Sequence, residues 1–302
     1  MFILNPDPYS LPSYRIGPFR TIDIDFNHKL EIDNSIDNYF KERFQERNFY
    51  YTINGRSAIN KALAFYKLQK NDIVTIFTTT GNFYISSCVT KEIEKFCKWS
   101  RKIEKNTKII FVNHEFGYPY LEPDSLLAYN LPIIEDCANT FFSTDKNNTI
   151  DKFGDFVIYS FPKMFPIQIG GLLVSKTSFT VNDTSIDPTL SQYIKNVLSY
   201  YIKLKDSIIE KRLQNYIKIR KNLLSLGLEE RFTLEEGIIP GVFMFRKGKV
   251  NVDLSKLKEH LWAHGIHCSV FYGEESFYIP SHQSLNDSDI EYFGEVIKSG
   301  IY

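Results

Sequence analysis

The chain lacks an excess of either charge, since its 302 residues carry 36 basic and 36 acidic side chains. Proteins that bind nucleic acid usually have a basic excess, so this balance argues against that class. Hydrophobic residues make up 43% of the chain and charged residues 24%, which is close to ordinary globular usage and excludes intrinsic disorder. At about 150 residues per domain, the length predicts one large domain, or a large domain with a smaller partner.

Long apolar runs are also missing. No stretch reaches the roughly 18 residues that are needed to propose a helix across the bilayer. The first residues, MFILNPD, lack the charged region followed by an apolar region that marks a secretory signal. We therefore expect a cytoplasmic protein that does not bind the membrane.

Cysteine is scarce, with four residues in the whole chain. They are widely spaced, without a C-x-x-C pair or a neighbouring histidine at the spacing of zinc ligands, so we expect no metal site. Reduced, mostly buried thiols are typical of a cytosolic protein. The four residues are Cys88, Cys97, Cys137 and Cys268.

The pattern along the chain divides it into four segments. Residues 1–50 are rich in turns and aromatic residues and are expected to form an N-terminal arm that leads into a short helix. Residues 51–180 show the regular alternation of an α/β domain. Residues 181–227 are predicted to form a long helical connection that stops at Gly227, and residues 228–302 a small α+β domain.

In the second segment, short apolar stretches alternate with helical patterns, which predicts an α/β fold with a mostly parallel sheet flanked by helices. The stretch KIIFVN at 108–113 is apolar without alternation, as expected for a strand that is covered on both faces. In such sheets, ligands usually bind at the carboxyl ends of the strands. Further strands are predicted at 73–77, 93–97, 131–135, 156–159 and 171–174, and helices at 54–66, 82–89 and 123–129.

The second half of the chain is predicted to begin with a long helix over about 190–226. The small domain then contains a strand at 242–245, a helix at 254–264 and a strand at 268–271. No internal repeat or low-complexity tract interrupts this order.

Three short stretches at predicted strand ends or helix starts hold side chains with useful chemistry. In the stretch 134–139, the carboxylate of Asp136 follows an apolar strand. In the stretch 160–171, Lys163 stands between two prolines in apolar surroundings, ahead of a glycine pair. In the stretch 54–58, a glycine turn opens a helix, whose free N–H groups can hold an anion.

Together these features fit the binding of pyridoxal 5′-phosphate. A desolvated lysine suits Schiff-base chemistry, because burial favours the neutral, nucleophilic amine. An aspartate in the same cavity can hold a pyridinium nitrogen in its protonated form, which makes the ring an electron sink. A helix N-terminus together with a serine hydroxyl can hold the phosphate.

The motifs and their order resemble those of the DegT/DnrJ/EryC1/StrS aminotransferases, the sugar-aminotransferase branch of the fold-type-I pyridoxal-phosphate enzymes. The resemblance runs through about residues 54–175 and returns weakly over 240–297. Each piece is short, and the specificity comes from their common order. The matching pieces are Gly55-Arg56-Ser57-Ala58, Asn71-Asp72-Ile73-Val74, His114 to Pro119, Glu135 to Asn139, Phe153-Gly154-Asp155, Ser160-Phe161, and Lys163 with Gly170-Gly171.

The resemblance implies a fold-type-I enzyme in which Lys163 holds the cofactor as an internal aldimine and then moves the substrate proton. Asp136 would pair with the pyridine nitrogen of the cofactor. Gly55, Arg56 and Ser57 would form the turn that binds its phosphate. Arg56 stands where the family has a small hydroxyl residue, so it either pairs with the phosphate or points to solvent.

Three further residues are candidate cofactor ligands, each with a simpler alternative. Ser160 either donates to the phosphate or merely ends a strand. Asn139 either forms a hydrogen bond near the phenolic oxygen of the ring or is a buried structural amide. Phe83 either stacks on the face of the ring or belongs to the ordinary core.

The chain departs from the family pattern at several points. Ser160 and Lys163 are closer together than in most sugar aminotransferases. The segment after Ser100 runs almost directly to Lys108, without a connection that is common in the family. The Asn-containing segment that usually reaches the cofactor phosphate of the neighbouring subunit has no counterpart.

The resemblance implies a homodimeric aminotransferase that takes its amino group from a donor, glutamate being the expected one. Its acceptor would be a keto sugar, linked to a nucleotide, in the biosynthesis of cell-surface polysaccharide. Two alternatives stay open. The first is a transaminase of a smaller keto compound, because the shortened segments could reshape the acceptor pocket. The second is a non-catalytic fold-type-I relative that serves as a scaffold subunit.

Overall fold

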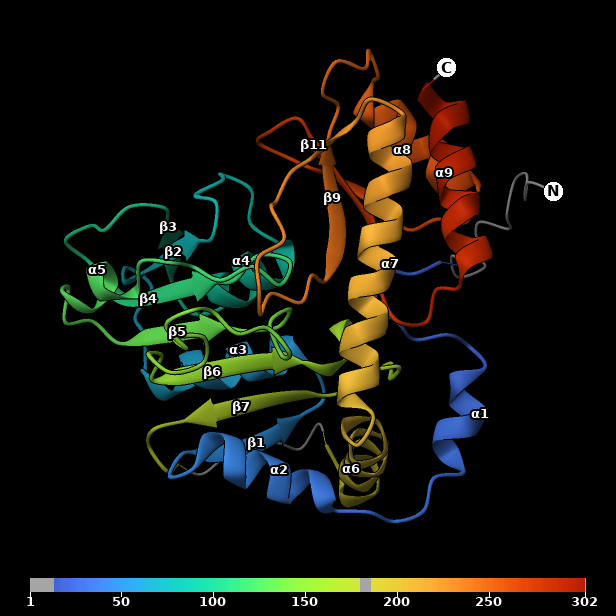
Figure 1. The fold of residues 1–302 in the computed structure, drawn as a ribbon. Helices are drawn as coiled ribbons and strands as arrows, with labels where there is room; N and C mark the ends of the chain where they lie inside the picture. The colour runs from blue at the N-terminus through green and yellow to red at the C-terminus, as the bar shows by residue number, and fades with distance from the viewer. Residues whose placement is uncertain (1–13, 180–185, 302) are drawn as a thin grey trace.

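The computed structural model describes residues 14–179 and 186–301. A seven-stranded sheet and a four-stranded sheet each carry their own helices, and the long helix α7 (Lys205–Ser225) runs beside both sheets (Figure 1). None of the helices in the described ranges combines the length and the apolar character needed to cross a membrane.

The large sheet confirms the predicted α/β class. Its strand order is β1-β7-β6-β5-β4-β2-β3. The strands β3, β2, β4, β5 and β6 run parallel, while β7 is antiparallel to both of its neighbours. The strands are β1 (Asn48–Thr52), β2 (Ile73–Thr78), β3 (Lys98–Ser100), β4 (Thr107–Asn113), β5 (Ile133–Asp136), β6 (Phe156–Ser160) and β7 (Gly171–Ser175).

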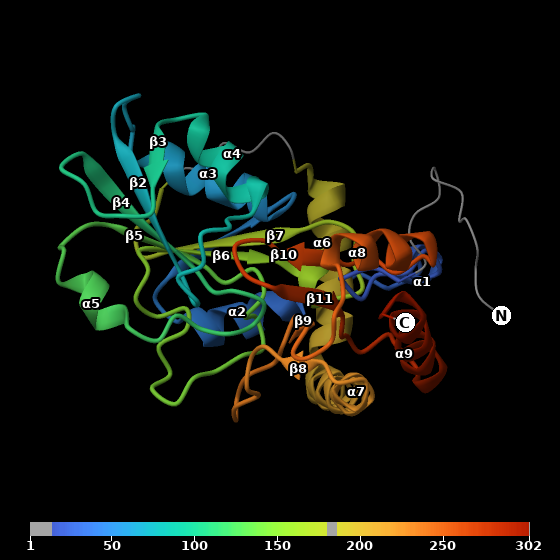
Figure 2. The same ribbon diagram turned by 90° about the horizontal axis from the view of Figure 1, so that it is seen from above.

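Helices cover both faces of this sheet, which explains why its central strands are apolar without alternation. The helices α3 (Gly55–Phe65) and α4 (Ser87–Glu94) pack on one face, and α2 (Ser35–Phe44) and α6 (Pro188–Ile202) pack on the other. Figure 2 shows α3 and α4 on one side of the strands and α2 on the opposite side. Two short helices, α1 (Asp23–His28) and α5 (Pro123–Leu127), lie at the periphery.

The described part of the expected N-terminal arm is more ordered than the sequence suggested. Helix α2 contributes the fully buried Phe40 to the core of the large sheet. Strand β1 begins at Asn48, inside the segment expected to be an arm, and pairs with β7 along its whole length. Pairing with a strand more than a hundred residues away is a long-range contact, which local turn signals do not reveal.

One strand was predicted in the wrong place. The stretch 93–97, expected as a strand, contains the end of helix α4, and the strand that follows is the short β3. The helix begins after Ser86, whose side chain accepts a hydrogen bond from the Cys88 N–H. Val89 and Ile93 are then buried on one face at helical spacing.

The long helix expected over 190–226 is two helices. Asp187 caps the start of α6 by accepting a hydrogen bond from the Leu190 N–H. The chain turns between the end of α6 and the start of α7 at Lys205. The predicted stop at Gly227 is confirmed, since this glycine follows α7 with a φ of 86°, a conformation that favours glycine. The beginning of this connection, at residues 181–185, lies outside the described residues.

The small sheet is antiparallel, with the strand order β10-β11-β9-β8. The predicted strands and helix of this region are present, and β8, β11 and α9 are additional. Helices α7, α8 and α9 form a common core with one face of the sheet. The elements are β8 (Glu229–Glu230), β9 (Val242–Arg246), α8 (Leu254–Ala263), β10 (Ser269–Phe271), β11 (Ser276–Pro280) and α9 (Asp287–Ile301).

The other face of the small sheet packs against the large domain. Along β9, Phe243 and Phe245 point into the helical core, while Val242 and Met244 join a second cluster that includes Tyr118 from the loop after β4. This alternation is the two-residue period of a strand. The small domain is thereby held at the carboxyl ends of the parallel strands, where ligands bind in α/β folds.

Candidate active site

A cavity of about 350 Å³ lies between the carboxyl ends of β4, β5 and β6, the first turns of α3 and α4, and the small sheet. Six of the eight residues proposed as cofactor ligands from the sequence line it, although they come from three separate parts of the chain. They are Gly55, Arg56, Asp136, Asn139, Ser160 and Lys163.

Asp136 is the last residue of β5 and is 4% exposed. One carboxylate oxygen accepts a hydrogen bond from the side-chain amide of Asn113 (2.7 Å) and the other accepts one from the Ala138 N–H (3.0 Å). Burial raises the pKa of Asp136, while these hydrogen bonds and the nearby Lys163 lower it. A cationic ring nitrogen placed against this carboxylate would compensate for the burial of its charge.

The start of α3 has the features of an anion-binding helix N-terminus. Asn54 caps the helix by accepting a hydrogen bond from the Ser57 N–H (2.9 Å), which explains why Ser57 is turned to the cap and does not line the cavity. Gly55 and Arg56 follow the cap, and the first turn contains no acidic residue. A Cβ at Gly55 would lie 3.2 Å from the Cβ of Ser160, so the glycine lets the two segments approach closely.

Lys163 stands at the end of a 3₁₀ turn (Phe161–Lys163) directly after β6. It lines the same cavity as Asp136, and its positive charge acts on that carboxylate. The expectation of a lysine buried in apolar surroundings is wrong for this chain, because Lys163 is exposed although its neighbours Phe161 and Met164 are buried.

Phe83 does not reach the cavity. Its side chain is 76% exposed, and the next residue, Tyr84, lines the cavity instead. Tyr84 packs edge-on against Phe271 of the small sheet, with ring centroids 6.0 Å apart. In an irregular extended segment, consecutive side chains point to opposite sides, so only one of the two aromatic residues can face inward.

The sequence reasoning missed Asn113 and Glu115, which line the cavity at the end of β4. Glu115 is 4% exposed, and one of its carboxylate oxygens accepts a hydrogen bond from the Thr80 N–H (2.7 Å). Burial raises the pKa of Glu115. Asn113 is the last residue of an apolar strand, as Asp136 is of β5, and Glu115 lies two residues beyond it. That position at a strand end was the signal that could have found them.

The side-chain atoms of His114, Glu135 and Cys137 that could bind a metal ion lie within 4.8 Å of one another, next to the cavity. His114 Nδ1 accepts a hydrogen bond from the Tyr120 N–H (2.9 Å), so the ring proton is on Nε2, which donates to Glu135 (3.0 Å). This tautomer leaves neither ring nitrogen open to a metal. Glu135 also accepts a hydrogen bond from the Asp151 N–H (2.6 Å), and the cluster is therefore a hydrogen-bonded part of the core.

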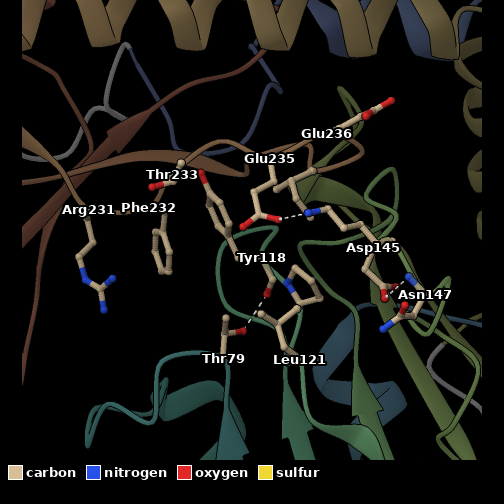
Figure 3. Close-up of a pocket in the computed structure, with 13 residues that line it drawn as sticks. Thr79, Tyr118, Leu121, Asp145, Asn147, Arg231, Phe232, Thr233, Glu235 and Glu236 are labelled. Atoms are coloured by element: carbon tan, nitrogen blue, oxygen red, sulfur yellow. Dashed lines mark hydrogen bonds and ion pairs between the residues drawn. The ribbon is translucent and has the colours of Figure 1, made fainter.

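A larger cavity, of about 570 Å³, lies between the loops after β2 and β4 and the segment that joins β8 to β9 (Figure 3). Its charged side chains are largely paired: Lys146 lies 3.8 Å from Glu235, and Arg231 donates to Glu274 (2.6 Å). The larger cavity holds neither the lysine nor the aspartate described above. We therefore assign the chemistry to the smaller cavity.

A lysine, a buried aspartate and an anion-binding helix start around one cavity, on an α/β fold with a small C-terminal domain, define a fold-type-I pyridoxal-phosphate enzyme. A family model described as "Putative PLP-dependent aminotransferase" matches residues 36–236, which is more than half of the chain. The chain belongs to this family of PLP-dependent aminotransferases, and pyridoxal 5′-phosphate is its cofactor.

Solved structures share the fold over nearly the whole chain. The aminotransferase TlmJ from Streptoalloteichus hindustanus has a TM-score of 0.72 and 16% identity, covering 92% of this chain and 94% of that one. The apo-form of Spr1654 from Streptococcus pneumoniae, described as a "Putative sugar aminotransferase", has a TM-score of 0.69 and 14% identity, covering 98% of this chain and 97% of that one. A DegT DnrJ EryC1 StrS aminotransferase from Brucella abortus has a TM-score of 0.67 and 13% identity, covering 93% of this chain and 94% of that one. No curated protein matches the sequence.

The residues of the smaller cavity fit this cofactor. Asp136 offers a buried carboxylate whose pKa is raised and which lacks a cationic hydrogen-bond partner among the described residues. Gly55 and Ser160 leave room for an anion at the start of α3. Lys163 supplies an amine on the same wall of the cavity.

Proposed function

We propose that this aminotransferase acts on a nucleotide-linked keto sugar in the biosynthesis of cell-surface polysaccharide, with glutamate as its amino donor. The observation that carries the catalytic part is the meeting of Lys163 and Asp136 in one cavity with the N-terminus of α3. The sugar is supported by the likeness in fold to a structure described as a "Putative sugar aminotransferase".

Within this proposal, each residue of the cavity has a separate task. When bound, pyridoxal phosphate withdraws electrons from the substrate carbon and makes its hydrogen acidic. Lys163 would hold the cofactor through its amine and would serve as the base that takes up and returns the substrate proton. Asp136 would hold the ring nitrogen in its protonated form through a charge-assisted hydrogen bond. Gly55 and Arg56 would bind the phosphate at the start of α3, with Ser160 beside them.

The remaining wall of the cavity supports a hydroxyl-rich acceptor. The side chains of Asn113, Glu115 and Asn139 and the rings of Tyr84 and Tyr278 line it. Carboxylate, amide and phenol groups can each form hydrogen bonds with sugar hydroxyls. A smaller keto compound would form hydrogen bonds with fewer of these groups than a sugar and would gain less binding energy from them.

We also propose a homodimer in the cytoplasm. The support for a dimer is the large apolar side chain of Phe83, exposed beside the cavity, with the half-exposed Tyr272 on the segment to which Asn82 is hydrogen-bonded. The support for a cytoplasmic setting is that all four cysteines are free thiols.

The test uses the purified chain with pyridoxal phosphate. The wild-type protein should turn yellow, and reduction with borohydride should add a phosphopyridoxyl mass to the peptide that contains Lys163. The Lys163→Ala variant should lose both signals, whereas Lys146→Ala, which removes a lysine from the larger cavity, should keep both. A colourless wild-type chain that is indifferent to the cofactor would favour the scaffold alternative.

A screen of amino acceptors then decides the substrate. With glutamate as donor, transamination should be fastest with nucleotide-linked keto sugars. Faster turnover of small keto acids or ketones than of every nucleotide-linked sugar would overturn the proposed acceptor while leaving the aminotransferase in place.

A further inference from the structure

Arg212, on the long helix α7, is 1% exposed and is among the largest fully buried side chains of the protein. Among the described residues, no carboxylate forms an ion pair with it. The contrast within the same molecule is Arg43, a mostly buried arginine whose guanidinium lies 2.9 Å from the carboxylate of Asp151. The charge of Arg212 is therefore buried without the carboxylate partner that a buried arginine usually has.

The guanidinium of Arg212 is directed instead at the turn that carries Lys163. Its Nη1 donates to the side-chain oxygen of Gln283 (2.6 Å), and its Nη2 donates to the carbonyl oxygen of Lys163 (3.4 Å). The amide nitrogen of Gln283 in turn donates to the carbonyl oxygen of Met164 (2.9 Å). Two side chains from distant parts of the sequence thus bind two consecutive carbonyl groups of the turn.

These contacts reach groups that the turn itself leaves open. The N–H groups of Met164 and Phe165 both donate to the carbonyl oxygen of Phe161, and the Phe161 N–H donates to Gly170. The carbonyl oxygens of Lys163 and Met164 take no part in these bonds. Without Arg212 and Gln283, both carbonyl groups would lack the partners that the structure gives them.

A packing role alone does not account for an arginine at this position. Burial without a compensating carboxylate lowers the pKa of Arg212 to about 9, which leaves the group charged at neutral pH. An apolar side chain of similar volume would fill the space without the cost of burying a charge. What an apolar residue could not supply is the forked set of donors that reaches two acceptors at once.

We propose that Arg212 and Gln283 are positioning residues that hold the backbone of Lys163 and Met164, and so direct the Lys163 amine into the cavity. Lys163 is exposed, and no hydrogen bond of its amine is present within the described residues, so its direction depends on its backbone. Because Arg212 lies on α7 and Gln283 follows β11, the pair also ties the lysine to the small domain. This inference rests on the proposed function of Lys163.

The test compares Arg212→Met, Arg212→Lys and the wild type. In Arg212→Met we expect kcat to fall roughly 100-fold, the cost of misplacing a reacting group by about 1 Å, with a much smaller change in KM for the amino donor. Borohydride trapping of the cofactor on the Lys163 peptide should slow in parallel. Arg212→Lys keeps the charge but cannot donate to two separate acceptors in the fixed geometry of a guanidinium, so it should recover only part of the loss.

A second measurement does not need the cofactor. Hydrogen exchange of the cofactor-free chain should speed up roughly tenfold for residues 161–170 in Arg212→Met and stay unchanged in β4. The control is Arg220→Met on the same helix, which removes a half-exposed arginine paired with Glu230 on the surface and should change neither readout. Should Arg212→Met fail to fold, Gln283→Leu removes the hydrogen bonds of Gln283 to Arg212 and to the Met164 carbonyl group and leaves the arginine in place.

Two results would overturn the proposal. The first is an Arg212→Met variant whose kcat and whose hydrogen-exchange rates at residues 161–170 equal those of the wild type. The second is exchange that speeds up equally throughout the chain, which would show that Arg212 only stabilises the fold. A wild-type chain that never takes up the cofactor on Lys163 would contradict the proposed function instead. The comparison of hydrogen-exchange rates would still decide whether Arg212 and Gln283 hold the backbone of the turn.

Discussion

Single buried side chains set the chemistry of this protein, and Asp136 is the clearest case. Its carboxylate lies at the end of a parallel strand, where the fold withdraws it from water and supplies two neutral hydrogen-bond donors. Burial raises its pKa, so the ionised form is costly by itself and is stabilised by a cationic partner. Such a carboxylate serves a bound ligand more than it serves the fold.

We predict that Asp136→Asn separates activity from stability. The variant should lower the rate of the half-reaction with the amino donor roughly 10²–10³-fold, the usual cost of losing one charge-stabilising group. Its melting temperature should stay within a few degrees of the wild type, because no ionised carboxylate remains to be buried. Stopped-flow absorbance and thermal unfolding would measure the two effects. Full activity in Asp136→Asn would contradict the assigned role.

His282 is buried, and its hydrogen bonds stabilise the fold. It is 3% exposed; its Nε2 donates to the Arg15 carbonyl (3.0 Å) and its Nδ1 accepts from the Ser284 N–H (3.3 Å). Both ring nitrogens are thus satisfied by the neutral imidazole. Burial, with the nearby charge of Arg212, lowers the pKa of His282 from 6.5 to about 3.

This shift predicts a loss of stability in acid. Between pH 6.5 and about 3, the unfolded chain binds a proton at His282 that the folded chain does not. The free energy of unfolding should therefore fall with decreasing pH by about 1.4 kcal/mol per unit from this residue. His282→Gln should flatten the dependence measured by denaturant titration, and His28→Gln, at an exposed position, should leave it unchanged. Equal slopes in all three proteins would refute the assignment.

Among the elements, the start of α3 is the one most directly shaped for a ligand. Asn54 uses the Ser57 N–H for its cap, so in the proposed site the phosphate would be bound by Gly55 and Arg56 at the beginning of the helix. A positive side chain at the positive end of a helix is unfavourable in isolation and becomes favourable when an anion lies between them. The element thus gains stability from what it binds.

We predict that Arg56→Ala weakens cofactor binding roughly fivefold, since Arg56 is exposed and an exposed charge pair contributes at most about 1 kcal/mol. The difference from wild type should shrink at high ionic strength, because salt screens the interaction. Titration of the apo-protein with pyridoxal phosphate at two salt concentrations measures both. Lys70→Ala, an exposed change beyond the end of α3, is the matched control. Identical affinities for Arg56→Ala and Lys70→Ala would contradict the prediction.

For the molecule as a whole, the unexplained feature is the exposure of apolar groups beside the cavity. Phe83 is 76% exposed, on a loop whose neighbour Asn82 donates to the Tyr272 carbonyl oxygen of the small domain (2.8 Å). A second copy of the chain in the proposed homodimer would bury this side chain. Such burial is worth about 1.5–3 kcal/mol for a large apolar residue.

Phe83→Glu should therefore shift the dimer towards monomers, because it replaces a buried apolar contact by a charge. Analytical ultracentrifugation over a range of concentrations would measure the shift. Leu127→Glu, a similar change on the peripheral helix α5, is the control and should leave the association unchanged. A wild-type chain that is monomeric at every concentration would end the dimer proposal.

Most of the α/β framework could be predicted from local patterns. The strands at 108–113 and 171–174 are short apolar runs between turn signals, and each was placed within a residue or two. The carboxylate at the end of β5 and the lysine after β6 were found because they interrupt such runs at the strand ends. A short helix was expected before residue 50, but β1 was missed, because its identity depends on pairing with a segment far along the chain.

The amino-acid sequence alone was sufficient for the class of the fold and the cofactor, because these depend on residue types at fixed local spacings. The three-dimensional arrangement was needed to place Tyr84 in the cavity and Phe83 outside it, to expose Lys163, and to bring Arg212 against its carbonyl group. Those outcomes depend on which residues from distant segments meet, and burial and hydrogen bonding between such segments are not encoded in any local pattern.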